Sequence, residues 1–193
     1  SQSYREALRW SERGAALGDS LAMNRVGWYY EKGFGVERNA RTALQWYRRA
    51  CDEGDGSAAG VARNNIGRCF HGGLGVEQDC TEAMRWYRDA VAHGDTTALS
   101  NIGRLFEDGL GVQKNLAEAV KYYRLAADKL DGEGLFNVGR CYRDGVSVSQ
   151  DFAEAQRWFL LAVEEEDAAA MTAMGALYHD AQGVPKNLSI ALS

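Results

Sequence analysis

A block of about 36 residues recurs along this 193-residue chain and restricts its fold more than any other feature. Gly67, Gly103, Gly139 and Gly175 are each 36 residues apart, and Gly27 precedes Gly67 by 40. Two further columns keep the same steps, one of valines and one of Asn or Asp: Val36, Val76, Val112, Val148 and Val184, and Asn39, Asp79, Asn115, Asp151 and Asn187. Self-similarity at a fixed period of this length is the signature of a solenoid.

Each block predicts two helices joined by a tight loop. In the block that follows residue 97, Ala98, Ile102 and Phe106 have the i, i+4, i+8 spacing of one helical face. Gly109 is suited to the left-handed position that ends a helix, and the Asn115 side chain is suited to cap the next helix. With a single proline in the chain, the pattern predicts an all-α fold, a right-handed superhelical α/α solenoid of helix-turn-helix repeats.

The repeated glycine lies inside the first helix of each block, where it costs about 0.5–1 kcal/mol relative to alanine. We expect the cost to be offset by a ring from the second helix that lies against the bare backbone. The column of large aromatic residues is the expected source of that ring: Trp10, Trp46, Trp86, Tyr122 and Trp158.

The motif Ala98-x-x-Asn101-Ile-Gly-x-x-Phe106, then Gly109-x-Gly-Val112, then an aromatic pair and Ala-Ala, resembles the Sel-one-like repeat, a relative of the tetratricopeptide repeat. The resemblance covers nearly all of the chain and implies an adaptor that binds other proteins, with no catalysis and no cofactor. Three positions depart from the glycine pattern and leave the loop geometry near them open: Leu130, Ser147 and Ala181.

The repeat divides the chain into one quasi-linear domain over residues 1–193. Residues 19–54, 55–94, 95–130 and 131–166 form four full repeats, residues 1–18 match the second helix of a preceding repeat, and residues 167–193 begin another. We expect a piece of a longer solenoid; the alternative is that the open ends pair in a homo-oligomer. Four extra residues near 55–61 predict a lengthened loop or an extra helical turn.

Two polar columns on the first helices form the candidate binding site. The residue after the glycine is Trp28, Arg68, Arg104 or Arg140, and the residue two before it is Arg25, Asn65, Asn101 or Asn137. The resemblance implies that these helices line a concave surface. Since arginine suits carboxylates and asparagine suits peptide backbone, the columns predict binding of a protein or peptide that is acidic or has a free C-terminal carboxylate.

The alternative for these columns is structural. The asparagines would then satisfy hydrogen bonds between helices, and the arginines would keep the surface soluble. Trp28 has two interpretations as well: it is an exposed interface anchor, or a preceding unit covers it.

Other site classes have little support. His71, His93 and His179 are scattered without a second ligand at i+4, and no nucleophile–base set appears, which argues against an enzyme or a metal site. A net charge of −5 and a pI of about 5.3, without a basic run, argue against nucleic acid. No apolar segment approaches the roughly 20 residues of a membrane span.

The four cysteines, Cys51, Cys69, Cys80 and Cys141, contain no CxxC pair, and their spacing differs from the disulfide-stapled relatives of this repeat family. A Cys51–Cys80 or Cys51–Cys69 disulfide stays open. Without one, a reducing, cytoplasmic compartment is favoured over the periplasm or envelope.

Three functional hypotheses follow. The first is a scaffold or adaptor that binds a protein or peptide on the concave face. The second is a structural or oligomerisation module that acts through its open ends or through the outer faces of its second helices. The third, implied by exported bacterial members of the family, is a cell-envelope module that contacts peptidoglycan or polysaccharide.

Overall fold

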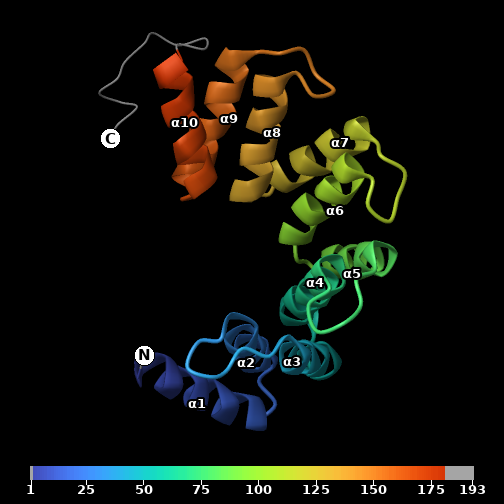
Figure 1. Ribbon diagram of the computed structural model, residues 1–193, viewed down its shortest axis with the longest axis vertical. Helices are drawn as coiled ribbons and strands as arrows, with labels where there is room; N and C mark the ends of the chain where they lie inside the picture. Colours follow the sequence, from blue (N-terminus) through green and yellow to red (C-terminus); the bar gives the residue numbers. More distant parts are fainter. Residues whose placement is uncertain (1, 181–193) are drawn as a thin grey trace. The chain divides into compact units, whose positions relative to one another are not determined.

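The computed structural model describes residues 2–180, and over this range the regular structure is helical throughout (Figure 1). Ten helices follow one another in this part of the chain, as the repeat predicts: α1 (Gln2–Ala16), α2 (Ser20–Lys32), α3 (Ala40–Glu53), α4 (Gly56–Gly72), α5 (Cys80–Ala92), α6 (Thr97–Asp108), α7 (Leu116–Ala127), α8 (Gly132–Asp144), α9 (Phe152–Glu164) and α10 (Ala168–Asp180). The all-α prediction is therefore confirmed, with α2, α4, α6, α8 and α10 as first helices and the others as second helices.

The helices divide into two compact units, each with its own core. The first unit contains α1 to α5, the first two residues of α6 and residues 110–112, and the second contains the rest of α6 with α7 to α10. In the first unit, Met23, Val26, Tyr47 and Ile66 are fully buried. In the second, Tyr123, Leu135, Val138, Phe159 and Leu177 are buried in the same way.

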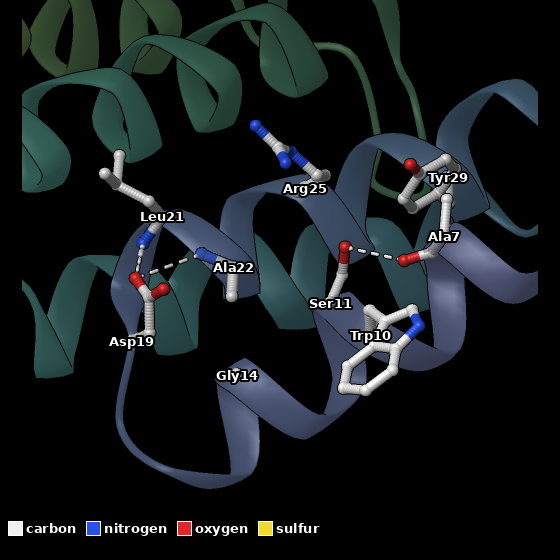
Figure 2. A pocket seen from close by; sticks show the side chains of 9 residues that line it. All are labelled: Ala7, Trp10, Ser11, Gly14, Asp19, Leu21, Ala22, Arg25 and Tyr29. Carbon is white, nitrogen blue, oxygen red and sulfur yellow. Dashed lines mark hydrogen bonds between the residues drawn. The ribbon is translucent and has the colours of Figure 1, made fainter.

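Side-chain caps and glycines fix where the helices begin and end. Asn115 Oδ1 accepts a hydrogen bond from the Glu118 amide at 3.1 Å, as the sequence predicts. Asp19 accepts from the amides of Leu21 and Ala22 in the same manner (Figure 2). Gly109 has a φ of 71°, the left-handed conformation that ends a helix. These interactions between residues close in sequence define the ends of the helices without tertiary contacts.

The ring that lies on each first-helix glycine belongs to the residue after the predicted aromatic column. A Cβ added to Gly27, Gly67, Gly103 or Gly139 would lie 2.6–2.7 Å from the nearest ring carbon of Tyr47, Tyr87, Tyr123 and Phe159, respectively. The prediction for Trp46, Trp86, Tyr122 and Trp158 is wrong by one position; these side chains are half-buried, and Trp10 is exposed. One residue turns a helix by 100°, so only one member of each aromatic pair can face the glycine.

The four-residue insertion extends a helix. α4 has 17 residues, whereas α2 has 13, so the extra residues add about one turn at its start. Of the two predicted outcomes, the extra helical turn is the one found.

Two loop positions keep a left-handed backbone conformation although another residue replaces their glycine. Leu130 and Ser147 stand where other repeats have glycine, and their φ values are 58° and 55°. Glu166 follows the same pattern with a φ of 60°. The neighbouring repeats thus impose the turn on residues that disfavour it. Ala181, Val184, Pro185, Asn187 and the rest of the last partial repeat lie outside the described residues.

Replacing Gly103 with alanine should destabilise the protein, because the new methyl group would meet the Tyr123 ring at 2.6 Å. We expect a loss of about 1–3 kcal/mol in the free energy of unfolding, measured by chemical denaturation. Gly72→Ala, at the exposed end of α4, is the control and should change stability little. Equal stability of both variants would contradict the ring contact.

Replacing Leu130 with glycine should stabilise the protein. The side chain is 62% exposed, so little packing is lost, while the strain of a left-handed leucine is relieved. We expect the free energy of unfolding to rise by about 0.5–1 kcal/mol. This gain is the relieved backbone strain minus the larger conformational entropy that glycine loses on folding. Leu130→Ala keeps the strain and should not reproduce the gain; if it does, the strain is not the cause.

Candidate functional site

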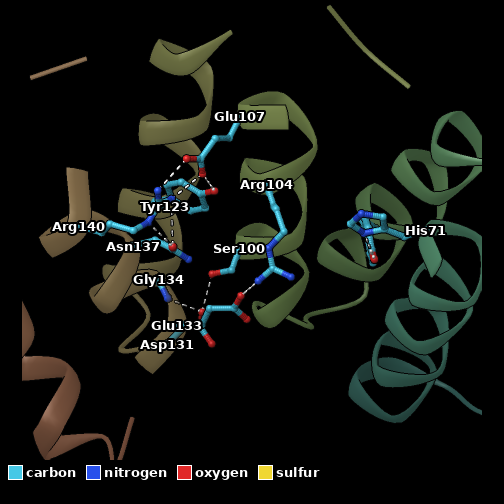
Figure 3. A network of polar contacts seen from close by, with 11 residues as sticks. His71, Ser100, Arg104, Glu107, Tyr123, Asp131, Glu133, Gly134, Asn137 and Arg140 are labelled. Carbon is cyan, nitrogen blue, oxygen red and sulfur yellow. Dashed lines mark hydrogen bonds and ion pairs between the residues drawn. The ribbon is translucent and has the colours of Figure 1, made fainter. Parts of the chain in front are cut away.

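Two of the predicted arginines form ion pairs with the preceding repeat. Arg68 Nη2 on α4 lies 2.9 Å from Glu31 Oε1 on α2. Arg140 on α8 binds Glu107 on α6 through two bonds, of 2.8 Å from Nη1 and 2.6 Å from Nη2 (Figure 3). Such a bidentate pair is geometrically specific, so these arginines connect one first helix to the next.

The same two glutamates accept a hydrogen bond from the ring that lies on the glycine. Tyr47 Oη donates to Glu31 Oε2 at 2.8 Å, and Tyr123 Oη donates to Glu107 Oε2 at 2.6 Å. Each glutamate therefore joins the two helices of its own repeat to the first helix of the following repeat. We call this arrangement the Tyr–Glu–Arg triad.

The triad is absent from the second and fourth repeats. In the second repeat His71 occupies the glutamate position, and its Nδ1 lies 3.3 Å from Tyr87 Oη. The fourth repeat lacks both the hydroxyl group and the carboxylate. Phe159 has no hydroxyl group, and the glutamate position is occupied by Arg143. Arg143 pairs with Asp144 next to it, at 2.7 Å. In this repeat the ring has no hydrogen-bond donor, and the residue at the glutamate position has no side-chain acceptor.

Interactions within the triad shift the pKa values of its members. For Glu107, the hydrogen bonds from Arg140 outweigh burial and lower the pKa below the ordinary 4.5. For Glu31, burial raises the pKa, but bonds from Lys32 and Tyr47 and the Arg68 charge prevail and lower it. Burial beside a carboxylate raises the pKa of both tyrosines, so they remain donors.

The predicted asparagines contact neighbouring side chains of the protein itself. Asn65 Oδ1 accepts from Arg68 Nη1 at 3.1 Å, and Asn137 Oδ1 accepts from Arg140 at 3.4 Å. Asn101 is buried, as is Asn137. Asn65 and Asn137 therefore orient the arginines toward their glutamates, which matches the structural alternative for this column.

A second polar column, three residues before the glycine, was not predicted. Asn24 Nδ2 donates to the Ala58 carbonyl at 3.2 Å, and Ser100 Oγ donates to Asp131 Oδ2 at 2.7 Å. Each bond joins a first helix to the start of the next one. The recurrence of Asn24, Asn64 and Ser100 in the sequence is the signal that could have revealed this role.

Three predicted residues remain at the surface. Arg25 is exposed and has no ion pair or hydrogen bond among the described residues. Trp28, which replaces the arginine of the triad, is 37% exposed and packs edge-on against Phe34 with ring centroids 5.2 Å apart. Arg104 is exposed and pairs with Glu133, which is 41% exposed. These three side chains can reach a partner without breaking buried bonds.

The cysteines offer no separate site. All four are free thiols. Burial raises the pKa of Cys69 and of Cys141 to about 11, so neither thiol is poised as a nucleophile. Within residues 2–180, no cluster of three or more potential metal ligands occurs. None of the helices described is both long and apolar enough to cross a membrane.

Comparison with known proteins identifies the repeat. The Sel1 repeat profile matches residues 1–19, 20–55, 60–95, 96–129, 132–167 and 168–193. A Sel1 repeat protein from Oxalobacter formigenes is 32% identical, with a TM-score of 0.73 over 99% of this chain and 74% of that one.

Two further structures are similar. A protective antigen of uropathogenic Escherichia coli with an SLR fold is 26% identical, with a TM-score of 0.69, and this chain covers 40% of its length while 98% of this chain is aligned. The immunity protein Pa5087 from Pseudomonas aeruginosa is 17% identical, with a TM-score of 0.67 over 95% of this chain and 66% of that one, and it supports the fold alone.

The triad predicts a pH dependence of stability. The pKa of Glu107 is lowered in the folded protein, so its ion pair contributes fully above the ordinary pKa of 4.5 and is lost as the pH falls through the lowered value. Glu107→Gln should lower the free energy of unfolding by about 1–3 kcal/mol at neutral pH. The difference from the wild type should be constant between about pH 7 and the ordinary pKa of 4.5, and should shrink as the pH falls below 4.5.

Urea denaturation of both proteins across this range measures the effect. Glu77→Gln, at an exposed loop residue, is the control. A Glu107→Gln difference that stays constant with pH would show that the ion pair is not the source of the stability.

Proposed function

The chain belongs to the Sel1 repeat family, whose members are generally protein–protein interaction scaffolds, and we propose that it binds a protein or peptide on the exposed face of its first helices. The proposed contacts come from Arg25 and Trp28 on α2 in the first unit, and a separate contact comes from Arg104 on α6 in the second unit. In this proposal Asn65, Arg68, Asn101, Asn137 and Arg140 shape the face and hold its helices in place. The family is a non-enzymatic repeat scaffold, in keeping with a binding role.

The observation that carries the proposal is the departure of the first full repeat from the pattern. Where later repeats have an asparagine and an arginine, this repeat has Arg25 and Trp28. Arg25 is left exposed without a partner among the described residues, and Trp28 has more than a third of its surface exposed. Exposed Trp and Arg side chains are the residue types that contribute most to binding energy at interfaces.

The chemistry of these residues suggests the kind of partner. Arg25 and Arg104 suit carboxylates, and Trp28 offers an apolar ring to a side chain or a peptide plane. An acidic segment or a free C-terminal carboxylate, with an apolar residue nearby, would satisfy Arg25 and Trp28 on α2. Arg104 is already paired with Glu133 at the surface, so a partner's carboxylate would compete for it at small cost.

Charge reversal at two of these residues tests the proposal. Arg25→Glu with Arg104→Glu should weaken binding of the principal partner by about tenfold or more, because it replaces attraction by repulsion. Trp28→Ala should cause a similar loss as a single change. The partner is first identified by cross-linking and mass spectrometry of lysate from the source organism, and its affinity is then measured by biolayer interferometry.

Arg48→Glu with Arg88→Glu is the matched control, since both arginines are exposed on second helices and the net charge change is the same. It should retain binding, and circular dichroism should show all variants folded. Equal loss in the control, or undiminished binding in the test variants, would contradict the proposed face.

A further inference from the structure

An open pocket of about 170 Å³ lies on one face of the second helix α5, within the first unit. One strip of that helix lines it, with residues spaced i, i+3, i+4 and i+7: Glu82, Arg85, Trp86 and Asp89. Trp86 is half-buried and its indole nitrogen is buried, so the part of the side chain that solvent reaches is carbon. The pocket therefore offers an aromatic surface with a carboxylate on either side of it along the helix.

Two other second helices show what can cover such a ring. On α3, the central guanidinium carbon of Arg49 lies 5.4 Å from the centre of the Trp46 ring. The Nε atom of Arg49 also donates to Glu53 Oε1 at 2.6 Å. On α1, Arg13 lies over the Trp10 ring at 4.5 Å. In both helices the arginine comes three residues after the tryptophan, so stacking of arginine on this ring is a contact that the protein already makes.

The same position on α5 carries the opposite charge. Asp89 comes three residues after Trp86, where α3 has Arg49. Glu82, four residues before the ring, replaces the neutral Thr42 of α3. The ring is thus kept while the arginine is exchanged for hydrogen-bond acceptors. Because the face of an aromatic ring attracts cations and a carboxylate strengthens their hydrogen bonds, this combination suits a cation from another molecule.

Both carboxylates can accept further hydrogen bonds. Asp89 Oδ2 accepts from Arg63 Nε at 2.6 Å, and Asp89 Oδ1 lies 3.2 Å from His93 Nδ1. These contacts hold a carboxylate that is still 45% exposed and that offers about four acceptor directions. Glu82 pairs with Arg85 at 3.2 Å, but the Arg85 side chain is 75% exposed, so another cation can compete for Glu82 at small cost.

We propose that this pocket binds an arginine side chain of a protein partner. The guanidinium plane stacks on Trp86, and its N–H groups donate to Asp89 and Glu82. Arginine suits the pocket better than lysine because its flat fork of donors can serve a ring and a carboxylate together, as Arg49 does on α3. The site lies on a second helix and takes a cation, so it differs in place and in charge from the face of the first helices, for which an acidic partner is proposed.

Peptide titrations of the full chain, followed by heteronuclear NMR, test the proposal. The probe is acetyl-Ala-Arg-Ala-amide. Its citrulline analogue keeps the planar shape without the charge, and its lysine analogue keeps the charge without the plane. The indole N–H signal of Trp86, assigned by comparison with Trp86→Tyr, should shift saturably with the arginine peptide. Both analogues should bind at least about threefold more weakly.

Two variants of the protein locate the contact. Asp89→Arg introduces the residue that α3 has at this position, and it should weaken binding of the arginine peptide about tenfold or more because it replaces attraction by repulsion. Glu82→Gln removes one exposed carboxylate and should weaken binding about twofold. Glu77→Gln, the same change at an exposed loop residue, is the matched control and should bind as the wild type does. Circular dichroism should show all variants folded.

Three results would overturn the proposal. The first is that the arginine peptide gives no saturable shift at Trp86, or shifts Trp46 equally although Arg49 already covers that ring. The second is that either analogue binds as tightly as the arginine peptide. The third is unchanged binding in both Asp89→Arg and Glu82→Gln. The face of the first helices is tested separately, because Trp28→Ala changes no residue of this pocket.

Discussion

The contact between a ring and a bare stretch of helix backbone sets the geometry of every complete repeat in the described chain. Tyr47, Tyr87, Tyr123 and Phe159 lie so close to a glycine that even a methyl group would clash. Close-packed interiors do not absorb such an addition without displacement. The contact therefore fixes the distance between the two helices of a repeat and offsets the low helix propensity of the glycine. It also fixes the position of the ring edge, so that a tyrosine hydroxyl group can reach the glutamate that binds the next repeat.

The Tyr–Glu–Arg triad uses that hydroxyl to connect repeats. In the first unit the tyrosine donates to Glu31, which also receives Arg68; in the second the same arrangement joins Tyr123, Glu107 and Arg140. A glutamate removed from solvent would be costly alone, but the tyrosine and the arginine both donate to it, and Lys32 adds a third bond to Glu31. Because repeats of this kind contact only their neighbours, these bonds act at two junctions, between α2 and α4 and between α6 and α8. Their use in packing explains why a column of arginines is not by itself evidence of a ligand site.

The sequence alone predicted the features that depend on local physics. The Asn115 cap and the left-handed Gly109 follow from residues near one another in the chain, and the added turn of α4 was one of two predicted outcomes. The ring was assigned to the wrong one of two adjacent residues because both members of each aromatic pair are large and apolar. They differ only in the direction in which they point from the helix axis. The ion pairs were missed because Arg68 and Glu31 are 37 residues apart, beyond any rule for neighbours on one helix. Read as columns, the tyrosine and glutamate positions change together only in the fourth repeat, where Phe159 accompanies Arg143; in the second repeat Tyr87 is kept and His71 replaces the glutamate.

The repeat pattern also indicates where binding can be accommodated. A residue that completes the pattern is committed to packing: Arg140 cannot turn to a ligand without leaving the half-buried Glu107 carboxylate without its cationic partner, which is more costly than losing a surface contact. A residue that departs from it has no such commitment. Trp28 and Arg25 replace the arginine and asparagine of later repeats. Arg25 has no ion pair or hydrogen bond among the described residues, so it can contact another molecule without breaking one.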